Sequence, residues 1–188
     1  MSFLRAETTS TFAAKNNIMK LSEHFQLVEF TRSATASARK IDNTPNDAVL
    51  ANLKNLVTKV LEPLRQWYGK PITIGSGYRC KALNTAVGGV KNSQHMTGEA
   101  ADLQVTLRSA TTGDASLEGQ KNVSKSDPTA YNAELRRLYD YIRKNLPHDQ
   151  VIMERNTPTS KTYWIHVSCK RDISKNRKQG IPELVKYK

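Results

Sequence analysis

The feature that most constrains the fold is a run of apolar residues at three- and four-residue spacing between residues 45 and 68. This spacing is that of one face of an α-helix, which needs a partner surface to bury its apolar side. Thr44 as N-cap and Pro45 in the first helical position predict where this helix begins, and Gly69 predicts its end. The apolar face consists of Val49, Leu53, Leu56, Val57, Val60, Leu61 and Leu64.

Shorter β-type runs follow this helix and alternate with two further helical patterns. The last two of these runs flank an Asn-Thr-Pro segment at 156–158, which predicts a β-hairpin. Residues 108–128 lack periodicity and predict a long surface loop. Strands are predicted at 71–74, 100–107, 150–154 and 163–168, and helices at 81–88 and 131–146. This order predicts an α+β fold, with a small and largely antiparallel sheet packed with helices.

The length of 188 residues fits one domain with a sizeable core. Residues 1–18 contain few bulky apolar side chains, and we expect a flexible N-terminal extension there. Residues 19–188 are then expected to form a single domain. The extension lacks the continuous apolar stretch of a secretory signal peptide. No apolar run approaches the ~20 residues that a membrane-spanning helix needs.

The charge balance favours polyanionic partners. The chain carries 29 Lys and Arg against 17 Asp and Glu, a net charge of +12. Such a chain is expected to adhere to nucleic acid, anionic lipid or an anionic cell envelope. The sequence has no helix-turn-helix pattern, RNP-type motif or zinc-finger spacing, so charge alone supports nucleic-acid binding. Cys80 and Cys169 are expected to be free thiols, with a disulfide between them left open.

One carboxylate and two imidazoles carry the most specific chemistry. Asp102 lies in a predicted strand between alanine and leucine, where an unpaired buried charge is costly. His95 precedes it across a Thr-Gly turn, and His166 lies in another predicted strand. Two histidines and a carboxylate with an open fourth position form a set that Zn²⁺ accepts in catalytic sites. Spacing alone leaves open that these are ordinary core residues; His24 and His148 are expected at the surface.

Three motifs occur in a fixed order. Residues 93–102 fit S-x-H-x-x-G-x-A-x-D, residues 76–79 read Ser-Gly-Tyr-Arg, and residues 164–168 carry W-x-H. Over about residues 20–180 the chain therefore resembles the zinc D-alanyl-D-alanine carboxypeptidase family, peptidoglycan peptidases with a hedgehog-type fold. The segments that resemble its phage- and prophage-associated branch are 21–25, 31–33 and 42–45.

The resemblance implies a role for each matching residue. The ligands of one Zn²⁺ would be His95, Asp102 and His166, with the fourth position left for water. Arg79 would hold a substrate carboxylate or polarise the scissile carbonyl, a task suited to its permanent charge and planar fork. Ser76 and Ser93 would line the site, although small residues beside glycines also serve turn geometry. Zinc lowers the pKa of water towards ~7, so that water attacks an amide once a base removes its proton.

The expected general base departs from the family pattern. The best-known members carry an acidic residue three positions before the last histidine, where this chain has Tyr163. Strand alternation would also point Tyr163 away from the metal. In the predicted hairpin Glu154 lies opposite Trp164, on the same face as His166 and one diagonal step from it. Glu154 is therefore the predicted base, the alternative being an exposed charge at a strand end.

These expectations combine into zinc-dependent hydrolysis of an amide bond in peptidoglycan stem peptides or cross-links. A lytic endopeptidase such as an endolysin is favoured over a D,D-carboxypeptidase. The protein is expected to be a monomer, made in the cytoplasm, that acts at the cell wall, where its charge would aid attachment to anionic polymers. The alternatives are an inactive wall- or zinc-binding protein of the same fold and, remotely, a nucleic-acid-binding protein.

Overall fold

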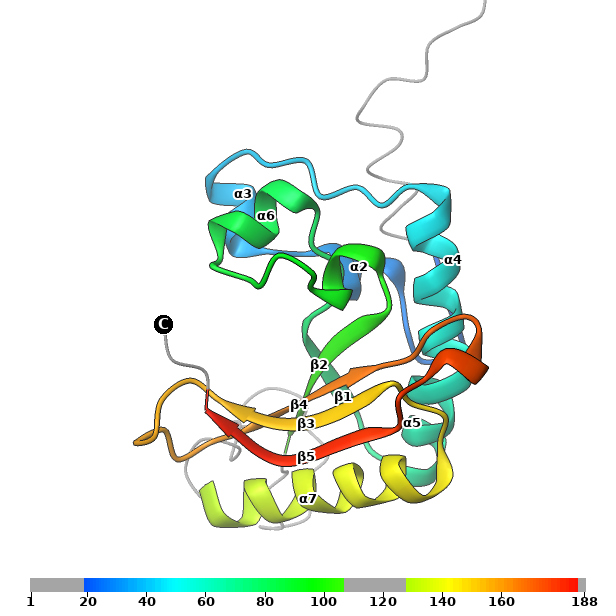
Figure 1. Cartoon of the computed structure of the whole chain (residues 1–188), viewed down its shortest axis with the longest axis vertical. Coiled ribbons are helices and arrows are strands. Elements are labelled where there is room, and N and C mark those ends of the chain that lie inside the picture. Colours follow the sequence, from blue (N-terminus) through cyan, green and yellow to red (C-terminus); the bar gives the residue numbers. More distant parts are fainter. Residues whose placement is uncertain (1–18, 107–127, 186–188) are drawn as a thin grey trace, which may run out of the picture.

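The fold is taken from a computed structural model that describes residues 19–106 and 128–185 (Figure 1). The expected N-terminal extension and nearly all of the expected loop at 108–128 lie outside these residues. Within the described ranges, no helix combines the length and the apolar character needed to cross a membrane.

The described helices and strands follow the predicted order with additions at both ends. The α-helices are α2 (Leu27–Thr31), α3 (Ala34–Ala38), α4 (Asp47–Leu56), α5 (Glu62–Tyr68), α6 (Lys81–Ala86) and α7 (Pro128–Asn145). The shorter turns are η1 (Val57–Leu61), η2 (Gln94–Thr97) and η4 (Ile173–Lys175). The strands are β1 (Ile72–Ser76), β2 (Ala100–Val105), β3 (Gln150–Arg155), β4 (Trp164–Ser168) and β5 (Gln179–Val185).

The helix predicted from Pro45 begins two residues later and has a different cap. Asn46 is extended, and its side-chain oxygen accepts a hydrogen bond from the Val49 amide at 2.9 Å. The predicted cap, Thr44, instead donates its backbone amide to the Asp42 side chain, in a turn that precedes the helix. The prediction was wrong here because Asn46 also has a good capping side chain and lies next to the first helical turn.

The same helix continues through η1 into α5 without a break in direction (Figure 1). At η1 the turns widen, and the Glu62 amide bonds the Val57 carbonyl five residues back. Pro63 follows directly and has no amide proton for the usual bond, which explains the position of the wide turn. The helix ends where Gly69 adopts a φ of 69° and donates to the Arg65 carbonyl, as its position predicted.

The sheet is five-stranded, with the order β1-β2-β4-β3-β5. The first three pairings are antiparallel and the β3–β5 pairing is parallel, so the sheet is largely antiparallel as predicted. In the β3–β4 hairpin Glu154 pairs with Trp164, and Ile152 pairs with His166. This register is the predicted one.

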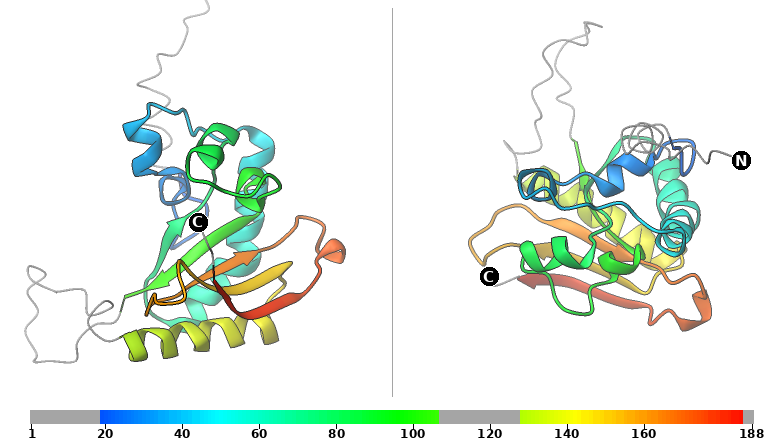
Figure 2. Two further views of the ribbon diagram at one scale, coloured as in Figure 1. Left: turned by 60° about the vertical axis from the view of Figure 1, so that its left-hand side comes forward. Right: turned by 90° about the horizontal axis from the view of Figure 1, so that it is seen from above.

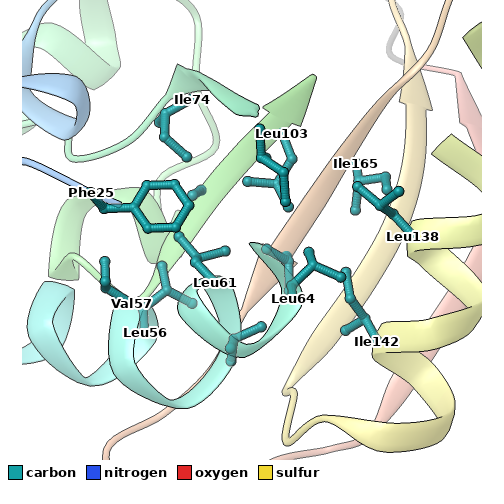
Figure 3. Packing of buried hydrophobic residues seen from close by; sticks show 14 of the residues in the cluster. Phe25, Leu56, Val57, Leu61, Leu64, Ile74, Leu103, Leu138, Ile142 and Ile165 are labelled. Atoms are coloured by element: carbon teal, nitrogen blue, oxygen red, sulfur yellow. The ribbon is translucent and has the colours of Figure 1, made fainter. Parts of the chain in front are cut away.

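The two faces of the sheet differ in composition: one is apolar and the other carries polar side chains. One face contributes Ala101, Leu103, Val105, Val151, Met153, Ile165 and Val167 to the hydrophobic core. Figure 3 shows how Leu61 and Leu64 of the long helix meet Leu138 and Ile142 of α7 against Leu103 and Ile165 of this face. The opposite face carries Asp102, Glu154 and His166, because side chains alternate along a strand. Burial of the core face therefore fixes which side chains face the other way.

The helices fall into two groups around the sheet. Helix α7 and the long helix of α4, η1 and α5 supply core residues on one side of it (Figure 3). Helices α2, α3 and α6 and the turn η2 gather on the other side, beyond the ends of β1 and β2 (Figures 1 and 2). Helices α3 and α6 pack against each other in this second group. Short helices and loops thus lie on the side of the polar face of the sheet.

Three further features of the fold differ from the predictions. Strand β5 was not predicted, because its segment contains Gly180 and Pro182 and is mostly exposed at a sheet edge. Helix α7 begins three residues earlier than predicted, at Pro128. His148 is buried rather than at the surface, and its Nδ1 lies 2.9 Å from the Leu146 carbonyl oxygen.

The helix start provides a test of the fold. Replacing Asn46 by alanine is expected to lower the free energy of unfolding by about 1 kcal/mol, because the Val49 amide loses its partner. Thr44→Ala, the matched control, is expected to cost less. Urea denaturation of both variants checks this, and a larger loss for Thr44→Ala than for Asn46→Ala would contradict the observed cap.

Candidate metal centre

Three side chains from separate elements meet on the polar face of the sheet. Asp102 in β2 and His166 in β4 are directly opposed across the antiparallel pair. His95 reaches them from η2, just before β2. All three are buried, with exposed fractions of 1 % for His95, 9 % for Asp102 and 8 % for His166. The structure thus brings together the three residues that the sequence singled out.

Their facing atoms are spaced as ligands of one ion. His95 Nε2 lies 3.3 Å from His166 Nδ1 and 3.3 Å from Asp102 Oδ1, and His166 Nδ1 lies 3.1 Å from Asp102 Oδ1. Tetrahedral ligands at the zinc–nitrogen and zinc–oxygen distances of ~2.0–2.1 Å lie about 3.3 Å apart. The three atoms therefore match three corners of a tetrahedron around one Zn²⁺.

The protonation of the cluster explains why it suits a cation. Burial lowers the pKa of His95 against the attraction of Asp102. His95 Nδ1 lies 2.6 Å from the Gly77 carbonyl, which only accepts, so Nδ1 carries the proton and Nε2 offers a lone pair. Burial acts to raise the pKa of Asp102, but interactions with the rings of His95 and His166 hold it well below its usual value. His95 Nε2 and Asp102 Oδ1 are thus two acceptor atoms 3.3 Å apart, and a positive charge between them stabilises this arrangement.

Two glycines allow the loops to approach the centre. Gly98 has a φ of 73°, and a Cβ there would lie 2.7 Å from the Val49 carbonyl oxygen. This glycine lets the chain turn from η2 into β2 directly against the long helix. A Cβ on Gly77 would lie 2.5 Å from the Phe30 Cα, so only glycine fits where its carbonyl meets His95.

Arg79 lies beside the centre. Its backbone amide donates to the His95 carbonyl at 3.1 Å, which ties the two segments together. Its Nη atoms lie 3.4 Å from the hydroxyls of Ser76 and Ser93, so the three predicted lining residues are in contact. Burial lowers the pKa of Arg79, against the attraction of Asp102 and Glu154. Among the described residues, none bonds its buried Nε.

A bulge in β1 explains the position of Ser76. Ile74 pairs with Leu103 on the core face, and the register then shifts so that Ser76 pairs with Asp102. Without the shift, the alternation of side chains would place residue 76 on the same face as Ile74. The bulge at Gly75 therefore moves a hydroxyl onto the face of the metal centre.

Asn43 is a site residue that sequence reasoning missed. Its buried amide donates to the carbonyls of Thr31 and Tyr78 at 2.9 and 3.0 Å and accepts from the Cys80 amide at 2.8 Å. These bonds hold the backbone on both sides of Arg79. The sequence placed Asn43 only within a family-like segment, and no local pattern marks a residue whose partners lie 12 to 37 positions away.

Glu154 is buried on the same face as His166, with 3 % of its surface exposed. Trp164 Nε1 donates to its Oε2 at 2.9 Å, which holds the carboxylate in place. Tyr163 packs at the edge of the core, and the guanidinium of Arg155 lies 5.3 Å from its ring centre. The placement of Glu154 excludes the alternative of an exposed charge at the strand end.

A second missed group, centred on Asp149, supports the turn that carries His95. Asp149 is fully buried and accepts hydrogen bonds from the Arg177 backbone, the Arg177 guanidinium and the Gln94 amide, the last at 3.0 Å. Gln94 is the neighbour of His95 in η2. Burial acts to raise the pKa of Asp149, but Arg177 and then Lys170 lower it to about 2. The C-terminal segment is thus joined to the metal centre through one carboxylate.

The described residues contain a second group of possible metal ligands, Glu23, His24 and Glu62. The Glu62 oxygens already accept hydrogen bonds from the Ser22 hydroxyl at 2.5 Å and from the His24 backbone at 3.2 Å, and His24 Nδ1 lies at 2.6 Å. This group anchors the N-terminal segment to α5. Both cysteines, Cys80 and Cys169, are free thiols.

The structure is that of an α+β protein in which two imidazoles and a carboxylate converge and could hold one metal ion. This is a donor set that catalytic zinc sites use. The peptidase M15 family model matches residues 23–125, more than half of the chain, and the chain belongs to this family. The chain is also 47 % identical over 58 residues to the zinc D-Ala-D-Ala carboxypeptidase of Streptomyces albus G. That alignment covers 30 % of this chain and 23 % of the Streptomyces protein.

The Asp149 group yields a prediction on stability. Arg177→Ala is expected to lower the free energy of unfolding at pH 7 by about 2 kcal/mol, because the buried Asp149 carboxylate loses hydrogen-bond donors. The loss is not larger because Arg177 is half-exposed and solvent screens its charge. The exposed neighbour Arg171, changed to alanine, is the control and is expected to cost less than about 0.5 kcal/mol.

The pH dependence of this effect has a defined sign. The pKa of Asp149 is about 2 in the folded protein and ordinarily 3.8, so its stabilising contribution is complete above pH 4 and lost as the pH falls towards 2. The difference between wild type and Arg177→Ala, measured by urea denaturation, should shrink over this interval. A difference that stays constant down to pH 2 would show that Asp149 is not the partner that matters.

Proposed function

We propose that this chain is a zinc-dependent peptidase that hydrolyses an amide bond in peptidoglycan stem peptides or cross-links. The observation that carries the proposal is the convergence of His95 Nε2, Asp102 Oδ1 and His166 Nδ1, with the buried Glu154 on the same sheet face. Membership of the peptidase M15 family supports it. His95, Asp102 and His166 are the proposed ligands, and bound zinc supplies a Lewis acid that makes water a nucleophile and polarises a carbonyl.

Glu154 is the proposed general base. It removes the proton from the attacking water and returns it to the leaving amine, the two proton transfers that amide hydrolysis requires. The hydrogen bond from Trp164 Nε1 to Oε2 fixes the position of the carboxylate on the sheet face that also carries His166. Tyr163, which stands where the best-known family members carry an acid, takes no part in this mechanism.

Arg79 is the proposed substrate anchor. Its guanidinium lies between the hydroxyls of Ser76 and Ser93, and its planar fork can bind a carboxylate through two parallel hydrogen bonds. Removal of a terminal D-alanine would place the substrate carboxylate against Arg79. In cleavage of a cross-link, Arg79 would instead polarise the scissile carbonyl.

The relative from Streptomyces is named a carboxypeptidase, which favours removal of a terminal D-alanine. A lytic, endolysin-like endopeptidase of the phage-associated branch is the second form of the proposal, favoured by the segments 21–25, 31–33 and 42–45. Mass analysis of fragments from digested cell walls separates the two. Free D-alanine indicates a carboxypeptidase, and new internal termini indicate an endopeptidase.

The proposed place of action is the cell wall, outside the cytoplasm. The net charge of +12 favours attachment to anionic wall polymers, and such attachment should weaken with salt. A monomer is the proposed working unit. Nucleic-acid binding would leave the buried cluster of His95, Asp102 and His166 without a purpose.

The proposed metal site predicts one strongly bound Zn²⁺ per chain. His166→Ala is expected to weaken zinc binding by at least about 100-fold, because it removes a direct ligand and loss of supporting residues alone costs 10- to 100-fold. His24→Ala, from the second histidine-containing group, should keep full occupancy. Equilibrium dialysis with metal analysis checks both, and unchanged binding in His166→Ala would reject the ligand set.

The proposed base predicts a loss of turnover without a loss of metal. Glu154→Gln keeps an acceptor for Trp164 and is expected to lower kcat by about 10²- to 10⁴-fold while zinc occupancy and thermal stability stay unchanged. Glu23→Gln, an exposed change of the same kind, is the control. Amide release from purified peptidoglycan is the measurement, and it should stop with a chelator and return with zinc.

Two outcomes would contradict this proposal. Full activity in Glu154→Gln would remove this residue from the mechanism. A zinc-loaded wild type that binds wall peptides and releases no amine would favour the inactive binding protein.

A further inference from the structure

A pocket of about 520 Å³ adjoins the metal centre. It is lined by residues of α3 and α6 and by the segment 75–79, and so it shares Ser76, Gly77 and Arg79 with the site already described. Figure 1 shows α3 and α6 side by side in the group of short helices that overlooks the sheet. A substrate held at Arg79 can therefore extend into this pocket.

The lining of the pocket is cationic and rich in donors. Arg32 and Arg79 both line it, and Ser33, Ser37 and Ser76 add hydroxyl groups. None of the described residues that line it is acidic. Two arginines and no acidic residue in the described lining favour a ligand that carries negative charge.

The two arginines are held in place by the backbone around them. The amide of Asn43 bonds the carbonyl of Thr31, which precedes Arg32, and the backbone on both sides of Arg79. Arg32 Nη2 also donates to the Ile74 carbonyl at 3.3 Å, which directs its side chain along β1. This bond uses one of the five donors of the guanidinium. These bonds hold the backbone beside both arginines and one nitrogen of the Arg32 guanidinium.

We infer that Arg32 binds a second carboxylate of the substrate, so that the preferred substrate is a peptide with an acidic residue near the scissile amide. The inference rests on the proposed function, because Arg79 is assigned there to the reacting end of the substrate. Arg32 then acts at a distance from the reacting atoms and determines specificity. Its contribution belongs to substrate binding and should appear in KM rather than in kcat.

The test uses two synthetic stem peptides that differ in one group, a free side carboxylate in the first and the corresponding carboxamide in the second. Wild type is expected to have a KM about 10- to 100-fold lower for the acid, the range of a charge-assisted hydrogen bond. Arg32→Gln should raise the KM for the acid to that for the carboxamide and leave the carboxamide unchanged. Arg39→Gln, an exposed change at the end of α3, should alter neither.

Two results would overturn the inference without affecting the proposed peptidase activity. One is an equal rise of KM for both peptides in Arg32→Gln, and the other is an equal KM for both peptides in wild type. Binding of both peptides to the zinc-loaded protein is measured in parallel by calorimetry. One outcome separates the two proposals: the acid binds more tightly to wild type, Arg32→Gln removes that preference, and no amine is released. In that case the assignment of the pocket stands and the proposed hydrolysis fails. Equal binding of both peptides by wild type would reject the pocket.

Discussion

The architecture depends on side-chain alternation in three neighbouring antiparallel strands. In β2, β4 and β3 every second residue is buried against α5 and α7, and the residues between them face the opposite way. A slip of one residue in any pairing would move apolar groups out of the core, at a cost of about 1.5–3 kcal/mol for each large side chain. The hydrophobic core thus holds Asp102, His166 and Glu154 in register from the opposite face of the sheet.

Alternation is also what made this part of the protein predictable. Its period of two can be read from a short segment, so the sequence alone placed His166 and Trp164 on one face and Ile165 and Val167 on the other. Centring the hairpin correctly then gave the pairing of Glu154 with Trp164, which the structure confirms. The long helix was predicted for the same reason, since its apolar spacing is local.

Other features depend on contacts that no local pattern records. Asn43 and Asp149 are small polar residues in loops, and their importance arises from partners such as Cys80 and Arg177 in distant segments. Strand β5 exists because it can pair with β3, although Gly180 and Pro182 are poor strand formers. The helix cap moved to Asn46 because two neighbouring residues had suitable side chains, and only the path of the incoming turn decides between them.

The formal charges at the centre explain how one metal and one anionic substrate fit the same site. Asp102 and Glu154 are buried carboxylates, and half-buried Arg79 offsets only one of them. A divalent ion held by two neutral imidazoles and Asp102 would change the local sum from −1 to +1, which a substrate carboxylate at Arg79 would then neutralise. Because uncompensated buried charge is costly, metal and substrate are expected to bind more tightly together than separately. Arg32, at the neighbouring pocket, is not counted in this sum, and its positive charge can bind a second anionic group of the substrate.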